Sequence, residues 1–458
     1  MGIIFLLQKC AKPLFGEFLL EEFKKFLRMG FIFALIIGTF WTVGTLRNAL
    51  FMTFVGAAHM PYAKAISLFF LIPVIIGYTK LVDKYRREKI FYILASGFGI
   101  ATLIFGLLFA YALTHFNSLF VSFSFGLGYA FYLFVESYGL LMVALFWAIA
   151  SDITLPESAK KGFSLVVAIG QLGGIFIPYF INSLPRRLGL ETSALSLYIA
   201  AFIMLALVFL LKDFFKKTPK EFLVSYHGKN EKVEEKKEET GFFEGLRLLV
   251  THKYLLGISA VILFPEIIST IFDVHFNSLA AQHYSGVHLV EYLGIYGSSV
   301  NIISFTFLIC GIGNVARLLG VGAALLLMPI IYGGAVCGFM MLNSLNFLFC
   351  LMASSKAINY ALNGPAIKQL YIPTTHNVRF KSQAWIESFG ARGAKGFGSM
   401  FNMLLGPLQK DLGEVLGRAR HALLASYFGF AVVFVWIFVA IFLGKKYKKA
   451  IDEKNVVC

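Results

Sequence analysis

Charged residues inside long apolar stretches are the part of this sequence best suited to chemistry. Arg47, Glu136, Asp273 and Lys356 each lie within such a stretch. A charge in the interior of a membrane-spanning helix costs roughly 2.5–3.5 kcal/mol on insertion scales, so it persists where it meets a partner or a water-filled cavity. Two cations and two carboxylates of this kind can bind an anionic solute, while the carboxylates complete the site or carry a proton.

Polar neighbours extend this set. Asn48 follows Arg47, and Tyr360 lies one helical turn after Lys356, so both side chains can orient a solute by hydrogen bonds. A guanidinium suits bidentate contact with phosphate or carboxylate. The alternative for Arg47 is a purely structural ion pair with Glu136. The predicted substrate site comprises Arg47, Asn48, Glu136, Asp273, Lys356 and Tyr360.

Further basic residues are predicted to act as a gate or to support the site. Lys64 opens one apolar stretch, and Arg392 and Lys395 open another. Snorkelling of Lys64 and Lys395 to the lipid headgroups is the alternative. Glu266 follows Pro265, where it can line a helix kink instead of a site. Lys368 can compensate for cations missing elsewhere.

Catalytic and metal-binding patterns are not found in the sequence. The five cysteines are scattered without a Cys-x-x-Cys pair, and no two histidines have metal-ligand spacing. We therefore expect no metal, no cofactor and no enzymatic activity. Glycines four residues apart, Gly170/Gly174 and Gly334/Gly338, predict close helix–helix contacts instead.

The composition identifies the elements that must position these residues. The 458 residues are 58% hydrophobic and only 14% charged, with a mean hydropathy of +0.76. An average soluble domain is about 25% charged, so a soluble enzyme is excluded. The formal net charge of +16 then indicates basic residues held on one side of a bilayer and not a nucleic-acid partner.

Stretches of about 20 apolar residues predict an all-α membrane protein with about twelve transmembrane helices. The predicted spans are 30–53, 64–81, 90–112, 129–150, 162–183, 193–211, 255–275, 292–312, 319–340, 345–366, 388–408 and 422–443.

The distribution of basic residues predicts the orientation. If the N-terminus is cytoplasmic, 33 of the 41 Lys and Arg residues fall on the cytoplasmic side and only five on the other. This bias favours both termini in the cytoplasm.

The polar stretch 213–253 is the only long linker, and it leaves six spans on either side. We therefore predict two six-helix bundles, as many secondary transporters use. The predicted segments are a cytoplasmic N-terminal segment (1–29), a first bundle (30–212), a cytoplasmic linker (213–253), a second bundle (254–443) and a basic cytoplasmic tail (444–458).

The turn after the second span, from Gly77 through Asp83 to Arg86 and Arg87, resembles the corresponding turn of the major facilitator superfamily. A weaker counterpart ends at Arg317 after the eighth span. An aspartate near basic residues can clamp an inner gate. An ordinary positively charged loop is the alternative.

Longer motifs resemble the nucleotide transporters of obligate intracellular bacteria and plastids, the ATP/ADP translocases. The motifs are Thr45-Leu-Arg47-Asn48 with 81–92, Glu136-Ser-Tyr with Phe146-Trp147 and 159–163, and Tyr360-Ala-Leu with Pro365, 371–373, 390–392 and Lys395. The resemblance implies a major-facilitator-like carrier of twelve helices in a bacterial inner membrane. It also implies nucleotide substrates, with ATP/ADP exchange or proton-coupled uptake as options.

Departures from that family concern its phosphate-facing lysines. Leu50 and Ile367 stand where the resemblance leads us to expect lysines, whereas acidic residues remain at Glu136 and Asp273. ATP carries about four negative charges, and each desolvated phosphate needs a cation or donor. Fewer lysines favour compensation by Lys356 and Lys368, or a substrate with less charge.

The leading hypothesis is a secondary transporter for a nucleotide or a similar anionic metabolite, working by alternating access. A proton-coupled carrier for another organic anion is the alternative, and a membrane-embedded enzyme or scaffold is the third reading. The sequence leaves the oligomeric state open.

Overall fold

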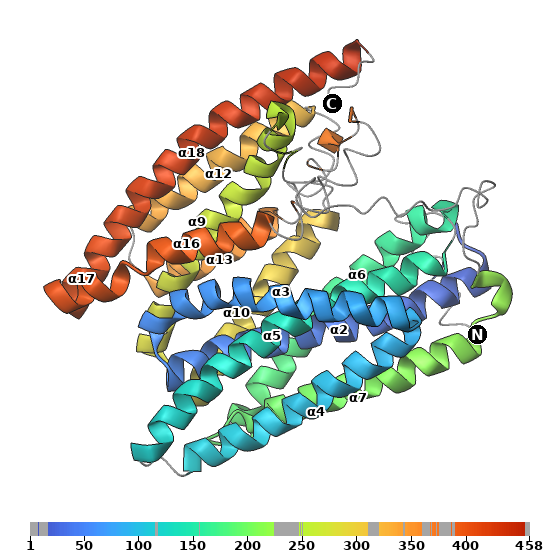
Figure 1. Ribbon diagram of the computed structural model, residues 1–458, viewed down its shortest axis with the longest axis horizontal. Coiled ribbons are helices and arrows are strands. Elements are labelled where there is room, and N and C mark those ends of the chain that lie inside the picture. The colour runs from blue at the N-terminus through green and yellow to red at the C-terminus, as the bar shows by residue number, and fades with distance from the viewer. Residues whose placement is uncertain are drawn as a thin grey trace. The chain divides into compact units, whose positions relative to one another are not determined.

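Figure 1 shows the computed structural model of the chain. The structure describes residues 8, 17–114, 118–154, 156–223, 247, 249, 251–309, 320–341, 344–359, 367, 369–371, 373–374, 386 and 390–453. Within these residues the regular secondary structure is helical throughout, which confirms the predicted all-α class. The elements are α2 (Leu20–Phe54), η1 (Ala57–His59), α3 (Met60–Lys84), α4 (Arg87–Thr114), α5 (Ser118–Asp152), α6 (Pro156–Arg187), α7 (Ala194–Lys217), η2 (Lys220–Phe222), α9 (Lys253–His283), α10 (Gly286–Ile309), α12 (Val321–Met341), α13 (Leu345–Ile358), α16 (Ala391–Asn402), α17 (Leu405–Leu412) and α18 (Glu414–Asp452).

Nine of the described helices are long and apolar enough to cross a membrane, so the chain is a multi-pass membrane protein. They correspond to the first seven predicted spans, the ninth and the twelfth. The eighth span coincides with α10, which is not among the nine. The tenth span contains only the short described helix α13, and the eleventh contains the short helix α16 and the start of α17. The count of twelve therefore stays a prediction.

The chain divides into two compact units. Unit 1 comprises Met1–Val55, Phe69–Glu234 and His283–Ile302; unit 2 comprises Gly56–Leu68, Glu235–Gln282 and Ile303–Cys458. Two helices belong to both units. The α3 helix begins in unit 2 and ends in unit 1, and α10 begins in unit 1 and ends in unit 2. The domain boundaries predicted from the sequence stay a prediction.

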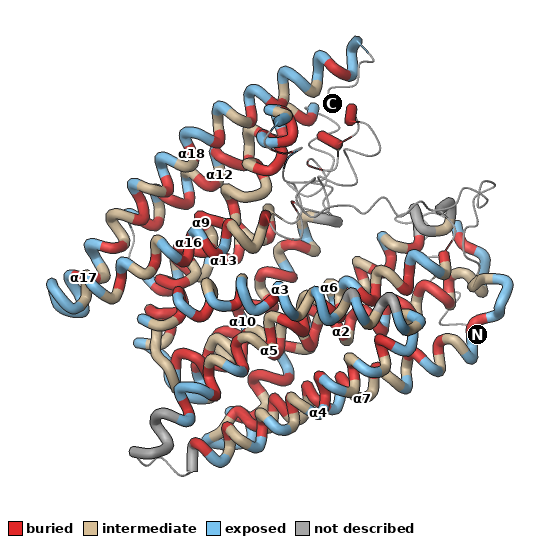
Figure 2. Tube along the Cα trace, in the orientation of Figure 1, coloured by how far each residue is buried: buried red, intermediate tan, exposed pale blue. Residues whose placement is uncertain are grey.

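In unit 1, α2 packs most extensively against α6, and buried positions recur along its length (Figure 2). Glycines allow the two backbones to meet. A Cβ at Gly173 would collide with the backbone of Ala34, and one at Gly30 would lie 2.6 Å from the Ile169 side chain. Small residues at such crossings are how membrane helices gain close packing where lipid gives no hydrophobic driving force. This packing fixes the rotation of α2, and hence the direction in which its polar residues point.

The predicted glycine contacts are confirmed at three of four positions. Gly170 meets Phe33, Gly174 meets Asn301, and Gly338 meets Phe347. At Gly334 no described atom lies within 4 Å of the place where a Cβ would be, so the described part of the chain shows no contact there.

Candidate functional site

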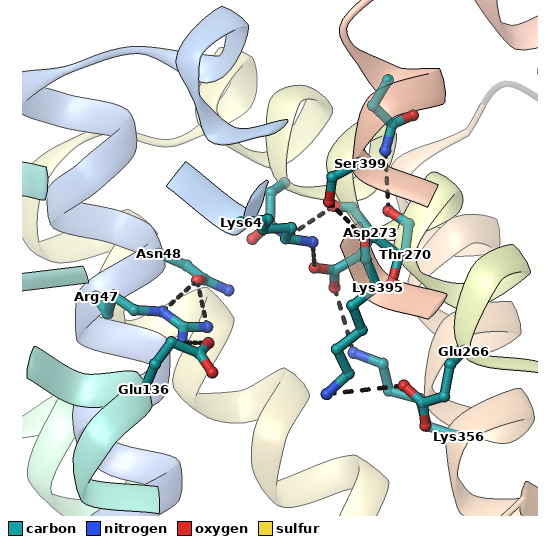
Figure 3. Close-up of polar contacts among 12 residues, drawn as sticks. Arg47, Asn48, Lys64, Glu136, Glu266, Thr270, Asp273, Lys356, Lys395 and Ser399 are labelled. Atoms are coloured by element: carbon teal, nitrogen blue, oxygen red, sulfur yellow. Dashed lines mark hydrogen bonds and ion pairs between the residues drawn. The ribbon is translucent and has the colours of Figure 1, made fainter. Parts of the chain in front are cut away.

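In unit 1 the predicted polar residues form one cluster around Arg47. The Arg47 guanidinium pairs with the Glu136 carboxylate through Nη1, and its Nε and Nη2 donate to Asn48 Oδ1 at 3.1 and 3.0 Å (Figure 3). The guanidinium carbon also lies 4.4 Å from the centre of the Tyr132 ring. We call Arg47, Asn48, Tyr132 and Glu136 the Arg47 cluster.

Helix geometry explains this arrangement. Tyr132 and Glu136 are four residues apart on α5, so their side chains share one face of that helix. Arg47 is flanked on α2 by Leu46 and Leu50, which are both buried. The arginine therefore lies between apolar positions that anchor α2. The ring, the carboxylate and the amide then hold its guanidinium by a cation–π contact and charge-assisted hydrogen bonds.

In unit 2 a single carboxylate holds two lysines. Asp273 on α9 accepts from Lys64 Nζ at 2.7 Å through Oδ2 and from Lys356 Nζ at 3.2 Å through Oδ1 (Figure 3). Lys64 lies in the first turns of α3 and Lys356 in the last turn of α13. We call these three residues the Asp273 cluster. With two ammonium groups and one carboxylate, the three residues carry a net formal charge of +1.

The Asp273 cluster is sheltered from solvent. The side chains of Lys64, Asp273 and Lys356 are 11%, 15% and 24% exposed. Ions in such surroundings interact more strongly than at a wet surface. Ammonium groups held there attract an anion that can replace part of their lost hydration.

A second, weaker ion pair uses another carboxylate of α9. Lys395 Nζ on α16 is 3.7 Å from Glu266 Oε2 on α9, and the Lys395 side chain is 55% exposed. Glu266 is seven residues, about two turns, before Asp273, so both carboxylates lie on the same side of α9. Gly398 allows α16 to approach α9 closely, because a Cβ at this position would come within 2.9 Å of the Ile267 carbonyl oxygen.

These contacts decide between some of the alternatives. Arg47 does pair with Glu136, as the structural alternative requires, and this leaves its role toward substrate a prediction. Lys64 is paired with Asp273 and not extended to a headgroup. Glu266 has a lysine within ion-pair distance in addition to its place beside Pro265.

The predicted gate residues are only partly described. Arg87 pairs with Asp152 at the end of α5 and donates to the Ala148 carbonyl at 3.1 Å, whereas Arg86 is exposed. Arg392 is half-buried in the first turn of α16. The Asp83 side chain and the residues Arg317, Tyr360 and Lys368 lie outside the described residues.

Tyr132 and Asp152 were missed by sequence reasoning. Tyr132 had a usable signal, because it lies one helical turn before Glu136. Asp152 had only its place at the end of an apolar stretch. Among the described residues, no group of three or more His, Cys, Asp or Glu side chains is arranged to hold a metal ion.

Solved structures with the same fold are membrane transporters. A bacterial homologue of the human lysosomal transporter Spinster aligns with a TM-score of 0.62 at 14% identity, covering 94% of this chain and 98% of that one. The nucleoside transporter NupG aligns with a TM-score of 0.62 at 13% identity, covering 91% and 98%. At these identities the likeness concerns the fold, and it confirms the major-facilitator-like architecture.

Sequence relatives cover nearly the whole chain. ADP,ATP carrier protein 1 of Rickettsia bellii is 25% identical over 94% of this chain and 95% of its own length. The Rickettsia prowazekii protein of the same name is 24% identical over 95% of both. Residues 8–350 match the family described as TLC ATP/ADP transporter. This match confirms the resemblance seen in the motifs: the chain belongs to the TLC ATP/ADP transporter family, a family of carriers and not of enzymes.

Proposed function

We propose that this carrier moves a nucleotide or a nucleotide-like anionic metabolite by alternating access. Family membership and the names of the Rickettsia relatives, ADP,ATP carrier proteins, support a nucleotide. The transporter fold supports alternating access. Exchange of ATP for ADP is one form of this activity.

The observation that carries the proposal is the sharing of Asp273 between Lys64 and Lys356. Phosphate oxygens accept the same charge-assisted hydrogen bonds from an ammonium group as a carboxylate does. An incoming phosphate can therefore take over one lysine while Asp273 keeps the other. The empty site stays charge-paired in this way, and the loaded site gains a contact that the empty site lacks.

Arg47 and Lys356 would contact the anionic part of the solute, with Lys64 added to the residues predicted from sequence. Asn48 and Tyr360 would orient the solute, and Glu136 would hold Arg47 until substrate arrives. Asp83, Arg86, Arg87, Arg317, Lys368, Arg392 and Lys395 would serve as gate or supporting residues.

The amount of charge on the substrate follows from the family departures. Leu50 is 4% exposed and Ile367 is 8% exposed, so neither position offers a polar surface in this chain. Fewer cations favour a substrate with less negative charge than ATP, such as a diphosphate, or contacts to ATP through only part of its phosphate chain.

Membrane location follows from the same set of observations. The bacterial source of the relatives supports an inner membrane, and the basic-residue bias supports both termini in the cytoplasm. Protons would be the coupling ion if uptake is not an exchange. In alternating access, the segments 30–212 and 254–443 would be the two bundles that move.

Proteoliposomes containing the purified chain test the proposal. We expect labelled ADP or ATP to enter only when the vesicles hold unlabelled nucleotide, and unlabelled nucleotides to compete better than citrate or sulfate. Lys410→Gln is a matched control, since this exposed lysine lies outside both clusters. Competition by simple anions at equal strength, or uptake that follows a pH gradient alone, would establish the organic-anion carrier instead.

A further inference from the structure

The last helix of the chain combines an apolar face with a run of lysines. Four of the five residues from Lys445 to Lys449 are lysines, and all four are exposed. They belong to α18, the long helix that ends near the C-terminal label in Figure 1, and the turns that carry them are largely exposed in Figure 2.

The start of a neighbouring helix gives a reference point for the position of these lysines along α18. A Cβ on Gly444 would approach Gly322 Cα to 3.0 Å, so Gly444 lies beside the first turn of α12. The α12 helix cannot continue outward through Gly320, whose φ is +84°. Lys445 to Lys449 lie about 2–8 Å further along α18 at 1.5 Å per residue. The headgroup layer on each side of the hydrocarbon core is about 5–8 Å thick, so if the core ends beside the first turn of α12, these lysines lie within that layer.

The lysines share one face of α18. At about 100° per residue, Lys445, Lys446, Lys448 and Lys449 cover an arc of about 160°. Leu443 and Ala450, both buried, point to the opposite side. Lys449 has Glu453 at 3.7 Å, whereas Lys445, Lys446 and Lys448 have no ion-pair partner within the described part of the chain.

An exposed apolar stripe leads into this arc. Phe434, Phe438, Ile441 and Phe442 are exposed, and helical spacing puts them on the same face of α18 as the lysines. One face of a single helix thus offers about two turns of apolar side chains followed by cations at headgroup depth. This order of surfaces fits a lipid molecule, which joins acyl chains to a charged headgroup.

We propose that this face of α18 binds an anionic phospholipid, with the phosphate held by Lys445, Lys446 and Lys448 and an acyl chain lying along Phe438 and Phe442. A soluble phosphate lacks a part that matches the aromatic stripe. A zwitterionic lipid carries its own cation, which offsets the attraction of the lysines. Each lysine near a membrane surface strengthens the binding of anionic lipid, and removing one lowers the affinity about fivefold.

Native mass spectrometry of the full chain, released from detergent with added lipid, measures this binding directly. We expect dioleoyl-phosphatidylglycerol to bind in preference to dioleoyl-phosphatidylcholine, and the preference to weaken with rising ammonium acetate. The variant Lys445→Gln/Lys446→Gln/Lys448→Gln should lose most of it. The matching triple Lys→Arg variant should retain it, because the charge remains.

The control variant Lys410→Gln/Arg420→Gln removes exposed basic residues elsewhere and should bind phosphatidylglycerol as the wild type does. Glycerol 3-phosphate at equal concentration should not displace the lipid. Equal binding by the triple Gln variant, a salt-independent wild type, or displacement by glycerol 3-phosphate would each overturn the proposal. None of these readouts depends on nucleotide transport.

Discussion

The two ion clusters hold their charges in different proportions. In the Arg47 cluster one guanidinium meets one carboxylate, supported by an amide oxygen and an aromatic ring. In the Asp273 cluster one carboxylate meets two ammonium groups. The first set is balanced and geometrically constrained, because the fork of a guanidinium fixes its partners. The second joins two flexible ammonium side chains to one carboxylate.

This difference assigns different work to the two clusters. A guanidinium paired with its own carboxylate can stay assembled without a ligand, whereas two ammonium groups that share one carboxylate can each form a further contact with an anion. We infer that the Asp273 cluster responds more strongly to the charge of the substrate, and that the Arg47 cluster contributes direction and geometry. The following changes would break or sharpen that contrast.

The largest effect is expected from Asp273→Asn. The change leaves two ammonium groups close together without their carboxylate, and removing one partner of a buried ion pair costs roughly 3 kcal/mol. Uptake should be lost and the unfolding temperature should fall, as measured in proteoliposomes and by thermal unfolding. Added pyrophosphate should raise the unfolding temperature of this variant part of the way back, because an anion can replace the missing carboxylate.

Adding Lys64→Met to Asp273→Asn tests the charge argument itself. The double variant has one ammonium group at this place instead of two, so the repulsion between like charges is gone and it should unfold at a higher temperature than Asp273→Asn alone. If Asp273→Asn is as stable and active as the wild type, Asp273 does not organise the two lysines.

Sequence reasoning found most members of both clusters but not their connections. Opposite charges within long apolar stretches were sufficient to select Arg47, Glu136, Asp273 and Lys356. The partner of Lys64 was out of reach, since Asp273 is 209 residues away and the contact depends on how α3 and α9 are rotated about their axes. Sequence periodicity gives a face of a helix and not the neighbour that this face meets.

The fold was predictable for a related reason. Long apolar stretches specify membrane helices almost by length alone, and nine of the predicted spans coincide with such helices in the described chain. The short helices α13 and α16 show where length fails. The segment Ala391–Asn402 contains three glycines and two charges, so its average hydropathy gives little indication of where a helix begins or ends.

A large effect on uptake alone is expected in the Arg47 cluster. Arg47→Ala should abolish nucleotide uptake while leaving protein abundance unchanged, because Glu136 is 31% exposed and can be hydrated when its partner is lost. Uptake assays with quantification of the reconstituted protein measure both quantities. Arg47→Lys should recover little, since a single ammonium cannot replace a guanidinium fork.

The double variant Arg47→Gln/Glu136→Gln distinguishes binding from a structural role. It removes both charges together and keeps side chains of similar size. If the pair only holds α2 to α5, the double variant should transport. If Arg47 contacts the substrate, the double variant should remain inactive. Normal uptake by the double variant or by Arg47→Ala would remove Arg47 from the proposed site.

An intermediate effect is expected from removing one lysine of the Asp273 cluster. Lys64→Met and Lys356→Met each leave Asp273 with one partner, so neither should lower the unfolding temperature much. Each should raise the KM for nucleotide by about tenfold, the equivalent of one charge-assisted hydrogen bond. The increase should be larger for ATP than for AMP. Equal increases for both nucleotides would show that these two lysines do not contact the phosphates.

The smallest effect is expected from Lys395→Gln. This lysine is 55% exposed and lies 3.7 Å from Glu266, which is the geometry of a weak surface pair worth about 0–1 kcal/mol. Uptake should change less than twofold. The unfolding temperature should change by no more than a few degrees. Lys395 pairs with a carboxylate on the same side of α9 as Asp273, but it is more exposed than the lysines of the Asp273 cluster. This variant therefore distinguishes the effect of burial from the effect of position. A loss of uptake comparable to that of Lys64→Met would mean that closeness to a carboxylate of α9, and not burial of the lysine, determines which lysines act on the substrate.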